Sequence, residues 1–531
     1  MPLCVHLRLF LVLSIRTLIF LVSIDPIAFN SVHAETGSEV CATCHREIYE
    51  AYRKTGMARS SGAVTGIEIE GSFAHKPSGV GYRVYRQDGA AWFSFNVSAV
   101  QGIRRLEYFI GSGTVGRSYL YTMDGFLYQA PVSWYASPAK WDLSPGYQQY
   151  DQLYLTRGIE TVCLECHASR LQSVAGTANG YRSPPFQEGG ISCERCHGAG
   201  DAHAAGRGKA INPAKLAPDR RDSICAQCHL AGEARIARTG AARIARAGAG
   251  GRYYPGDRLA DSLVVFEWSG KPDMNVTSHF ETLAESACKS VSGDRLWCGS
   301  CHDPHRAPAE AEKAAFYRAR CLECHQTAEC SRGQDCAGCH MPKRPVRDVQ
   351  HSAYTDHAIR KPGASAALTA ASGRRKLVPF GGAAAGDREI GLAYAAVPGF
   401  EKLAPEYLER APQDDAEVLS HLAYLYESSG NPSKAAPLYQ NALKLDPSQV
   451  AAAVNLGNLY IKGGQAREAI RLWQYALQKS PGLETVSLSL AVAQYRGGDS
   501  AAAVASLTKL LELNPANTVA RKLLSEPRSR R

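Results

Sequence analysis

The chain has 531 residues, of which 45% are hydrophobic, and this length is enough for two or three domains. Its formal net charge is +10 and it contains 17 cysteines. After residue 34 no run approaches the ~20 apolar residues that a membrane span needs. The sequence therefore excludes transmembrane segments beyond its first residues, and the use of its cysteines has to be explained.

The first 34 residues have the features of a secretory signal. Arg8 precedes an apolar run that only Arg16 interrupts, and Val32-His33-Ala34 is a small-residue cleavage site. Arg16 and Asp25 make this run a poor membrane span, although a retained N-terminal anchor is the alternative. We therefore predict a signal peptide over residues 1–34 and an exported, periplasmic protein.

A five-residue pattern, Cys-x-x-Cys-His, first occurs at residues 41–45 and occurs seven times in all. Two thiols on one turn can bond to the vinyl groups of a porphyrin, and the histidine that follows becomes a ligand of its iron. Zinc knuckles and redox dithiols also use Cys-x-x-Cys, but neither needs that histidine. The pattern predicts seven covalent haem c groups. The copies, motifs 1 to 7 below, are Cys41/Cys44/His45, Cys163/Cys166/His167, Cys193/Cys196/His197, Cys225/Cys228/His229, Cys298/Cys301/His302, Cys321/Cys324/His325 and Cys336/Cys339/His340.

The segment from about 65 to 147 has no cysteine, and its pattern is typical of β structure. Aromatic and β-branched runs flank Asp88-Gly89 and Asp124-Gly125, which are hairpin signals. Residues 111–116 match G-x-G-x-x-G, but a strand pattern follows them where a dinucleotide site requires a helix. We predict a small antiparallel insertion with a glycine-rich turn and no nicotinamide site.

From residue 234 onward the sequence repeats an eight-residue unit, ARIARTGA-ARIARAGA. Its four arginines form a basic stripe: Arg235, Arg238, Arg243 and Arg246. The stripe can dock an acidic redox partner, and a solvated low-complexity insertion is the alternative interpretation.

Only two cysteines, Cys288 and Cys330, lie outside both the seven motifs and the signal. An oxidising compartment allows two arrangements, a disulfide between them or buried thiols. A disulfide would close a loop of about 40 residues, for which the chain-entropy estimate is roughly 4 kcal/mol of stabilisation.

The C-terminal part is predicted to be a helical repeat. Residues 361–386 are rich in alanine, glycine and serine, which is linker composition. Beyond them Pro447, Pro481 and Pro515 are 34 residues apart, the period of the tetratricopeptide repeat. We expect tetratricopeptide repeats over 414–525 and a degenerate helical cap over 387–413.

These segments define the expected fold class, mainly α. A loop-rich multihaem cytochrome domain (35–360) with a small antiparallel β insertion precedes an α-solenoid. Each ferric haem carries roughly one net negative charge, so after removal of the signal seven haems bring the chain to roughly +2. The positive formal charge therefore does not indicate nucleic-acid binding.

Seven low-spin irons need seven further axial ligands, and six histidines remain outside the motifs, the signal and the repeats. Met57 completes the count, because a thioether can bind haem iron and raises its potential. If Met57 does not bind, one haem is five-coordinate and open to a substrate. The candidate distal ligands are His75, His203, His279, His305, His351, His357 and Met57.

The runs CxxCHDPH at 298–305 and CHMPKRPVRDVQHSAYTDH at 339–357 resemble a known group. They are similar to multihaem cytochromes related to the tetrahaem carriers of hydroxylamine oxidation and the pentahaem nitrite reductases, with a C-terminal tetratricopeptide region. The resemblance implies that His305 is the distal ligand of a neighbouring haem. The nitrite reductases place lysine in a CxxCK motif at their catalytic haem, and this chain has no such motif.

We expect a periplasmic electron carrier that docks a redox partner protein through its repeats. A reductase or oxidase of a small nitrogen or sulfur compound at one open haem is the alternative, and a redox-active scaffold is a third. The state of the seventh iron discriminates the first two.

Overall fold

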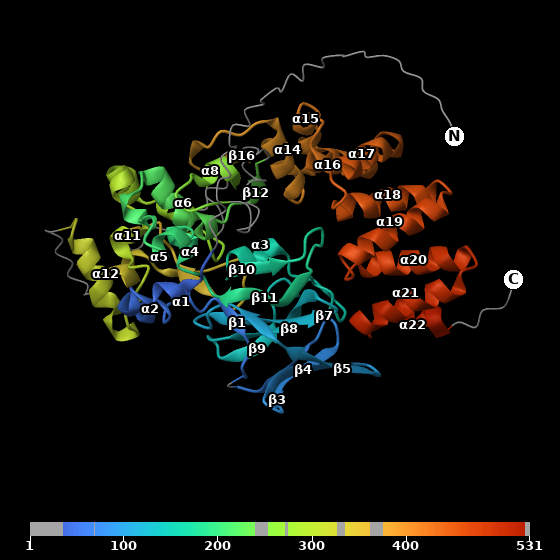
Figure 1. Cartoon of the computed structure of the whole chain (residues 1–531), viewed down its shortest axis with the longest axis horizontal. Helices are drawn as coiled ribbons and strands as arrows, with labels where there is room; N and C mark the ends of the chain where they lie inside the picture. The colour runs from blue at the N-terminus through green and yellow to red at the C-terminus, as the bar shows by residue number, and fades with distance from the viewer. Residues whose placement is uncertain are drawn as a thin grey trace, which may run out of the picture.

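The computed structural model describes residues 35–67, 69–238, 253–270, 274–325, 335–361 and 375–525. Figure 1 shows a β module at the bottom, short helices gathered on the left and an arc of longer helices on the right. The predicted signal peptide, Cys330, Arg243 and Arg246 lie outside the described residues.

The β module consists of two antiparallel sheets formed by the first nine strands. One sheet has the order β2-β3-β4-β5 and the other the order β1-β6-β7-β8-β9. The strands are β1 (Ser61–Ala63), β2 (Gly71–His75), β3 (Val80–Gln87), β4 (Ala90–Val97), β5 (Val100–Leu106), β6 (Tyr108–Ile110), β7 (Gly116–Met123), β8 (Phe126–Tyr135) and β9 (Lys140–Leu143).

Both predicted hairpins are present. Gln87 pairs with Ala90 across Asp88-Gly89, and Met123 pairs with Phe126 across Asp124-Gly125. All four turn residues have positive φ, from 51° to 80°, which matches the twist of a two-residue hairpin. The glycine-rich segment 111–116 is the turn between β6 and β7 with no helix after it, as predicted.

Alternating side chains of the two sheets form one core. Phe93, Phe95, Tyr121 and Val132 are among its most buried members. Burial of such aromatic and branched residues is the main stabilising term of a sandwich of this kind. The β part of the chain is larger than the predicted small insertion, because seven further strands lie among the cysteine motifs and beyond.

Those later strands were not predicted, because most of them are short, and β14 to β16 lie beyond the last motif. β13 is the run LVVFEW, which periodicity alone cannot distinguish from a buried helix. β10 pairs with β11, β12 with β13, β13 with β16, and β14 with β15. Their bounds are β10 (Ala168–Ser173), β11 (Tyr181–Gly189), β12 (Ala234–Ala237), β13 (Leu263–Trp268), β14 (Lys343–Pro345), β15 (Ala353–Thr355) and β16 (Leu377–Pro379).

The motifs themselves lie on short helices. Figure 1 places α1, α4, α6, α11 and α12 on the side of the molecule away from the repeats. Their bounds, with neighbouring helices, are α1 (Ser38–Cys41), α2 (Arg46–Tyr52), α3 (Thr161–Glu165), α4 (Glu194–His197), α5 (Asp201–Ala204), α6 (Pro218–His229), α8 (Leu259–Ser262), α9 (His279–Ala284), α10 (Ala287–Ser292), α11 (Cys298–Cys301), α12 (Lys313–Leu322) and α13 (Cys336–His340).

The predicted linker, 361–386, is not uniformly irregular where it is described. β16 adds to the sheet of β12 and β13, and Leu377 is buried opposite Trp268. The run LVPF, residues 377–380, is apolar enough to join a core although it follows an alanine- and glycine-rich stretch.

The C-terminal helices form antiparallel pairs with the predicted 34-residue period. Ala435, Ala469 and Ala503, at equivalent positions, are fully buried where paired helices approach closely. The helices are α16 (Ala416–Ser428), α17 (Pro432–Leu445), α18 (Val450–Lys462), α19 (Ala466–Lys479), α20 (Glu484–Arg496), α21 (Ser500–Leu513) and α22 (Thr518–Ser525). Before them, α14 (Asp387–Ala396) and α15 (Ala404–Leu408) occupy the predicted cap.

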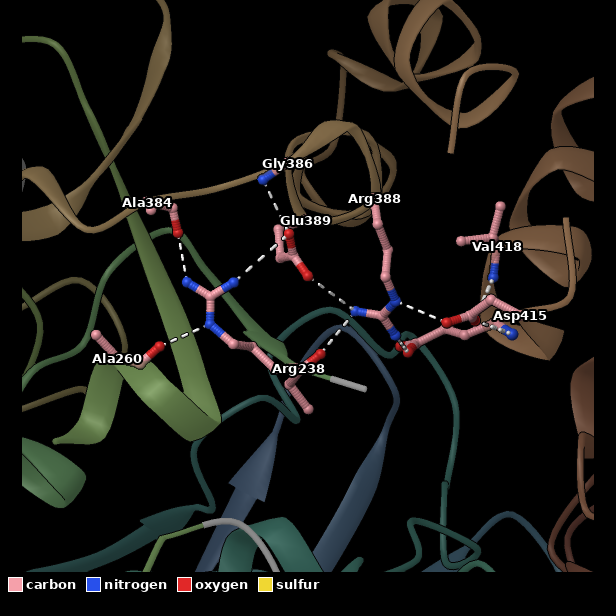
Figure 2. Close-up of polar contacts among 10 residues, drawn as sticks. Arg238, Ala260, Ala384, Gly386, Arg388, Glu389, Asp415 and Val418 are labelled. Carbon is pink, nitrogen blue, oxygen red and sulfur yellow. Dashed lines mark hydrogen bonds and ion pairs between the residues drawn. The ribbon is translucent and has the colours of Figure 1, made fainter. Parts of the chain in front are cut away.

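The cap is joined to the part of the chain that carries the cysteine motifs by two arginines (Figure 2). Arg388 is buried, donates to the Ala237 carbonyl (2.7 Å) and pairs with Asp415 (2.7 Å). Arg238 donates to the carbonyl of Ala260 (2.6 Å) and to that of Ala384. Arg238 also pairs with Glu389 of the cap (3.8 Å), so it is engaged within the fold and is not a free member of the predicted basic stripe.

The last repeats are joined to the β module. Leu513, at the end of α21, is buried in the core of that module. The Arg104 guanidinium donates to the Glu512 carbonyl (2.7 Å), and Lys509 pairs with Asp124. The solenoid is therefore fixed at its first and at its last helices.

Candidate haem sites

Each motif is positioned by one helical turn. The amide of the motif histidine donates to the carbonyl of the first cysteine in motifs 1, 3, 5 and 6, with N···O distances of 2.8–3.0 Å. A spacing of three and four residues places both thiols and the imidazole on one face of that turn. All fourteen motif cysteines are half-buried or exposed, so none of them is fully buried in a core. This arrangement fits attachment of one porphyrin per motif.

The motifs lie close to one another although they are far apart in sequence. Cys41 of motif 1 lies beside Cys193 of motif 3, and Cys166 of motif 2 beside Cys228 of motif 4, so that each thiol of a pair shifts the pKa of the other. Two further pairs, Cys225 with Cys298 and Cys321 with Cys336, join motif 4 to motif 5 and motif 6 to motif 7.

The fold does not enclose every predicted attachment residue. Four motif cysteines are exposed to solvent: Cys44, Cys163, Cys324 and Cys339.

In motifs 1, 6 and 7 the exposed thiol belongs to the second cysteine, Cys44, Cys324 or Cys339, while the first cysteine of each motif is half-buried. Those first cysteines are the ones that contact a thiol of another motif. Three residues of helix rotate the second side chain by about 60° from the first, so it can face solvent when the first faces a neighbouring motif. Haem attachment at these three cysteines therefore rests on the sequence motif and not on an enclosing pocket, and it stays a prediction.

The rings of two motif histidines lie opposite histidines that are candidate distal ligands. The ring centroids of His45 and His203 are 6.2 Å apart with an interplanar angle of 17°. For His197 and His305 the values are 5.8 Å and 12°. A metal–imidazole bond is about 2 Å long, so two imidazoles on opposite sides of one iron have centroids roughly 6 Å apart. The two pairs match that separation.

Two more candidates lie beside motifs 4 and 5. His279 is 4.8 Å from His229 of motif 4, between ring centroids, and the two rings are perpendicular. His357 is 6.2 Å from His302 of motif 5 and 4.9 Å from His279. The structure therefore brings four of the six spare histidines to motif histidines.

Backbone carbonyls orient several of these rings. Nδ1 of His197 contacts the Ile211 carbonyl (2.7 Å), and Nδ1 of His340 the Arg360 carbonyl (2.9 Å). Among the distal candidates, Nδ1 of His203 and Nδ1 of His357 contact backbone carbonyls at 3.2 and 3.0 Å. A ring that donates through Nδ1 presents Nε2 as its metal-binding nitrogen. The donor set therefore fits haem iron.

Burial keeps the central imidazoles neutral. It is the main cause that lowers the pKa of His279 to about 3 and the pKa of His302 to about 4. Burial also lowers the pKa values of His229 and His357. A neutral imidazole is the form that binds a metal.

The other three candidate ligands lie elsewhere. His75 contacts Ser78 through Nδ1 (2.8 Å) at the β2–β3 turn, and Nε2 of His351 contacts Asp142 (2.9 Å). Met57 is half-buried, and the Ser60 hydroxyl donates to both its carbonyl (2.9 Å) and that of His167 (2.8 Å).

In the part of the chain that the structure describes, the rings of three motif histidines have no ring contact with a second imidazole. They are His167, His325 and His340. His167 is the most enclosed, and its Nδ1 is buried without a hydrogen-bond partner. Of the two spare cysteines, Cys288 is a half-buried free thiol, while its predicted partner lies outside the described residues.

The groups that orient the rings could not be predicted from the sequence. Besides the carbonyls, the Tyr317 hydroxyl lies 3.3 Å from Nδ1 of His302. No sequence signal identifies such partners, because tertiary packing alone brings a carbonyl or a phenol to the ring.

Models of known families match segments in both halves of the chain. Residues 143–198 match the model of cytochrome c554 and c-prime, and residues 289–329 match the doubled CXXCH motif. Residues 426–473 and 454–518 match tetratricopeptide repeats. The chain thus carries cytochrome c segments with haem-binding motifs, followed by a repeat region.

These families indicate haem-based electron transfer in the first part and protein interaction in the second. Cytochrome c domains of this kind are usually exported. Within the described ranges, no helix is long and apolar enough to cross a membrane.

Solved structures match in the repeat region. "Crystal structure of MamA protein" is 22% identical, with 27% of this chain and 76% of that chain covered and a TM-score of 0.22. YrrB, titled "a TPR protein with an unusual peptide-binding site", is 19% identical over 26% of this chain and 73% of its own, with a TM-score of 0.24. No curated protein matches the chain.

Proposed function

We propose that the protein is a periplasmic electron carrier with seven covalent haem c groups and a repeat region that docks a redox partner. The observation that carries this proposal is the set of imidazole pairs between distant motifs, such as His45 with His203 and His197 with His305. Two strong axial ligands per iron, such as two imidazoles, are what a low-spin electron-transfer haem requires.

The motif cysteines would attach the porphyrins, and the motif histidines would be the proximal ligands. His203, His305, His279 and His357 would be the distal ligands of motifs 1, 3, 4 and 5 respectively. Haem iron supplies reversible one-electron chemistry, and the chain's part is to hold each ring at fixed distance and in its neutral form. His75, His351 and Met57 remain candidates for the other irons.

The contacts between motifs support transfer through the whole set. Thiol and imidazole contacts connect motif 1 to motif 3, motif 3 to motif 5, motif 5 to motif 4, and motif 4 to motif 2. Motif 6 lies beside motif 5, where the charge of Cys321 adds to burial in raising the pKa of Cys301 to about 11. Motif 7 joins through motif 6. Every motif therefore has a neighbour, which is the arrangement that short-range electron transfer needs.

The test is a count of haems and of their spin states. Intact mass should exceed that of the apoprotein by seven haems, and electron paramagnetic resonance of the oxidised protein should show bis-imidazole low-spin iron. A mature protein with six or fewer haems would contradict the stoichiometry. Fewer than four haems with bis-imidazole signals would contradict the assignment of His203, His305, His279 and His357.

The second candidate function is reduction or oxidation of a small nitrogen or sulfur compound at an open haem. It is favoured by His167, a buried imidazole with no second imidazole stacked on it in the described part of the chain. The shared hydroxyl of Ser60 places the Met57 backbone beside that of His167.

Met57→Ala distinguishes the two functions. If Met57 is a ligand, the variant should convert one haem to high spin and bind cyanide where the parent binds none, with the covalent haem count unchanged. A parent protein that already holds a high-spin haem and turns over nitrite or hydroxylamine would support the enzyme instead.

A further inference from the structure

Asp356 is a buried carboxylate outside the motifs and the candidate ligands. It follows β15 and its residue is only 2% exposed. One oxygen accepts from Arg344 (3.0 Å) and from Arg360 (2.5 Å), and the other accepts the Ala358 amide (3.0 Å). Arg360 also donates to Glu285 (2.5 Å), just after α9.

The segment 355–360, which contains Asp356, contacts one imidazole through a backbone carbonyl at each of its ends. The carbonyl of Thr355, the residue before Asp356, contacts Nδ1 of His357 at 3.0 Å. The carbonyl of Arg360, four residues after Asp356, contacts Nδ1 of His340 at 2.9 Å. The Arg360 amide donates back to the His340 carbonyl at 2.9 Å, so Arg360 and motif 7 are tied twice.

The two imidazoles belong to different haem sites. His340 is the histidine of motif 7, while His357 lies opposite His302 of motif 5. Asp356 fixes the backbone between them, since its carboxylate binds one amide and two guanidiniums from that segment and from β14. Loss of its charge would leave two half-buried guanidiniums without their shared partner, which is a strong reason for the segment to move.

We propose that Asp356, acting with Arg344 and Arg360, is a positioning residue that sets an axial ligand of two haems at once, His357 for motif 5 and His340 for motif 7. The inference rests on the proposed haem attachment. Its consequence is that these two centres respond together to a change at a carboxylate that touches neither ring.

The experiment uses the full-length holoprotein with Asp356→Asn, which keeps the size of the side chain and removes its charge. The matched control is Asp348→Asn on the same β14–β15 connection, where the exposed carboxylate accepts, among the described residues, only the Val276 amide (3.0 Å). Asp356→Glu restores the charge and should move the signals back toward those of the parent. The readouts are intact mass, low-spin resonance signals and titration with imidazole.

In Asp356→Asn, we expect two low-spin signals to shift or broaden together. We also expect external imidazole to bind one haem at a concentration 10- to 100-fold lower than in the parent, the range by which loss of an outer-shell partner weakens a metal site. Asp348→Asn should match the parent in both readouts. The proposal would be overturned if the low-spin signals and the imidazole affinity of Asp356→Asn equalled those of the parent. It would also be overturned if the low-spin signal of one haem alone shifted.

Arg360→Gln gives the same test should Asp356→Asn fail to mature. It keeps the Arg360 backbone carbonyl and leaves Asp356 paired with Arg344, so we expect the same two signals to move by a smaller amount. No movement there overturns the proposal. Intact mass of the parent tests haem attachment separately, so a failure of the proposed function is recognised independently.

Discussion

Glu267, on β13, is a partly buried carboxylate that titrates near neutral pH. Burial is the main cause that raises its pKa to about 7, and the neighbouring charges of Glu281 and Glu285 on and after α9 add to it. The folded chain therefore binds a proton between about pH 4.5 and 7 that the unfolded chain releases, so this group's contribution to stability falls as pH rises through that window.

Glu267→Gln removes this pH-dependent cost. At pH 8 we expect the variant to be more stable than the parent by about 1–2 kcal/mol, after allowance for solvent screening of a partly exposed group. Toward pH 4.5 the difference should vanish. Thermal unfolding at several pH values measures it, with Glu468→Gln as the control, since Glu468 forms an exposed pair with Arg471 (3.2 Å). A constant difference at all pH values would contradict the assignment.

At the same scale, the sequence predicts candidate residues for haem attachment but not which imidazole rings lie opposite one another. The motif has local geometry, because a three- and four-residue spacing fixes both thiols and the imidazole on one turn. The pairing of His45 with His203 crosses 158 positions, as the numbering shows. Counting ligands limited the candidates, but only tertiary packing selects among them.

Among the elements, those with strong local signals were predictable. The two Asp-Gly pairs, which have positive φ, predicted the two hairpins, and the 34-residue period predicted the repeats. β13 and β16 were not predicted, since a six-residue apolar run and a three-residue strand carry no period that distinguishes strand from loop or helix.

The contact between the cap and β12 depends on a buried charge. Arg388 on α14 pairs with Asp415 (2.7 Å) and Glu417 (2.7 Å) and donates to the Ala237 carbonyl (2.7 Å). Arg388→Met removes the cation and leaves the buried Asp415 without it, so we expect a loss of about 3–5 kcal/mol. Denaturant unfolding followed by far-ultraviolet circular dichroism measures the change.

The matched control is Arg410→Met on the same cap. Arg410 pairs with Asp387 at 3.0 Å on the surface, and such exposed pairs contribute about 1 kcal/mol or less. Equal losses in the two variants would show that the buried network is no stronger than a surface pair.

At the scale of the whole molecule, the solenoid is held to the cytochrome part by its inter-repeat turns. Glu484, the first residue of α20, accepts the Thr156 hydroxyl (2.7 Å) from the segment after the β module. It also accepts the side-chain amides of Asn514 (3.0 Å) and Asn517 (2.9 Å) in the turn after α21. One carboxylate thus ties two turns of the solenoid to the segment beside the sheets.

This attachment predicts that repeats and haem sites unfold as one cooperative unit. In the parent, the far-ultraviolet transition of the helices and the Soret transition of the haems should coincide on heating, which is the sign of a single transition. Glu484→Ala removes three hydrogen bonds to a charged group, each worth about 1.5–3 kcal/mol. We therefore expect the helical transition to move to lower temperature and to precede the Soret change.

Glu512→Ala is the control, because the Glu512 side chain makes an exposed pair with Lys509 (3.2 Å) while its backbone carbonyl keeps the bond from Arg104. Coincident transitions in Glu484→Ala would mean that Leu513 and the contacts at Arg388 hold the two parts together without it.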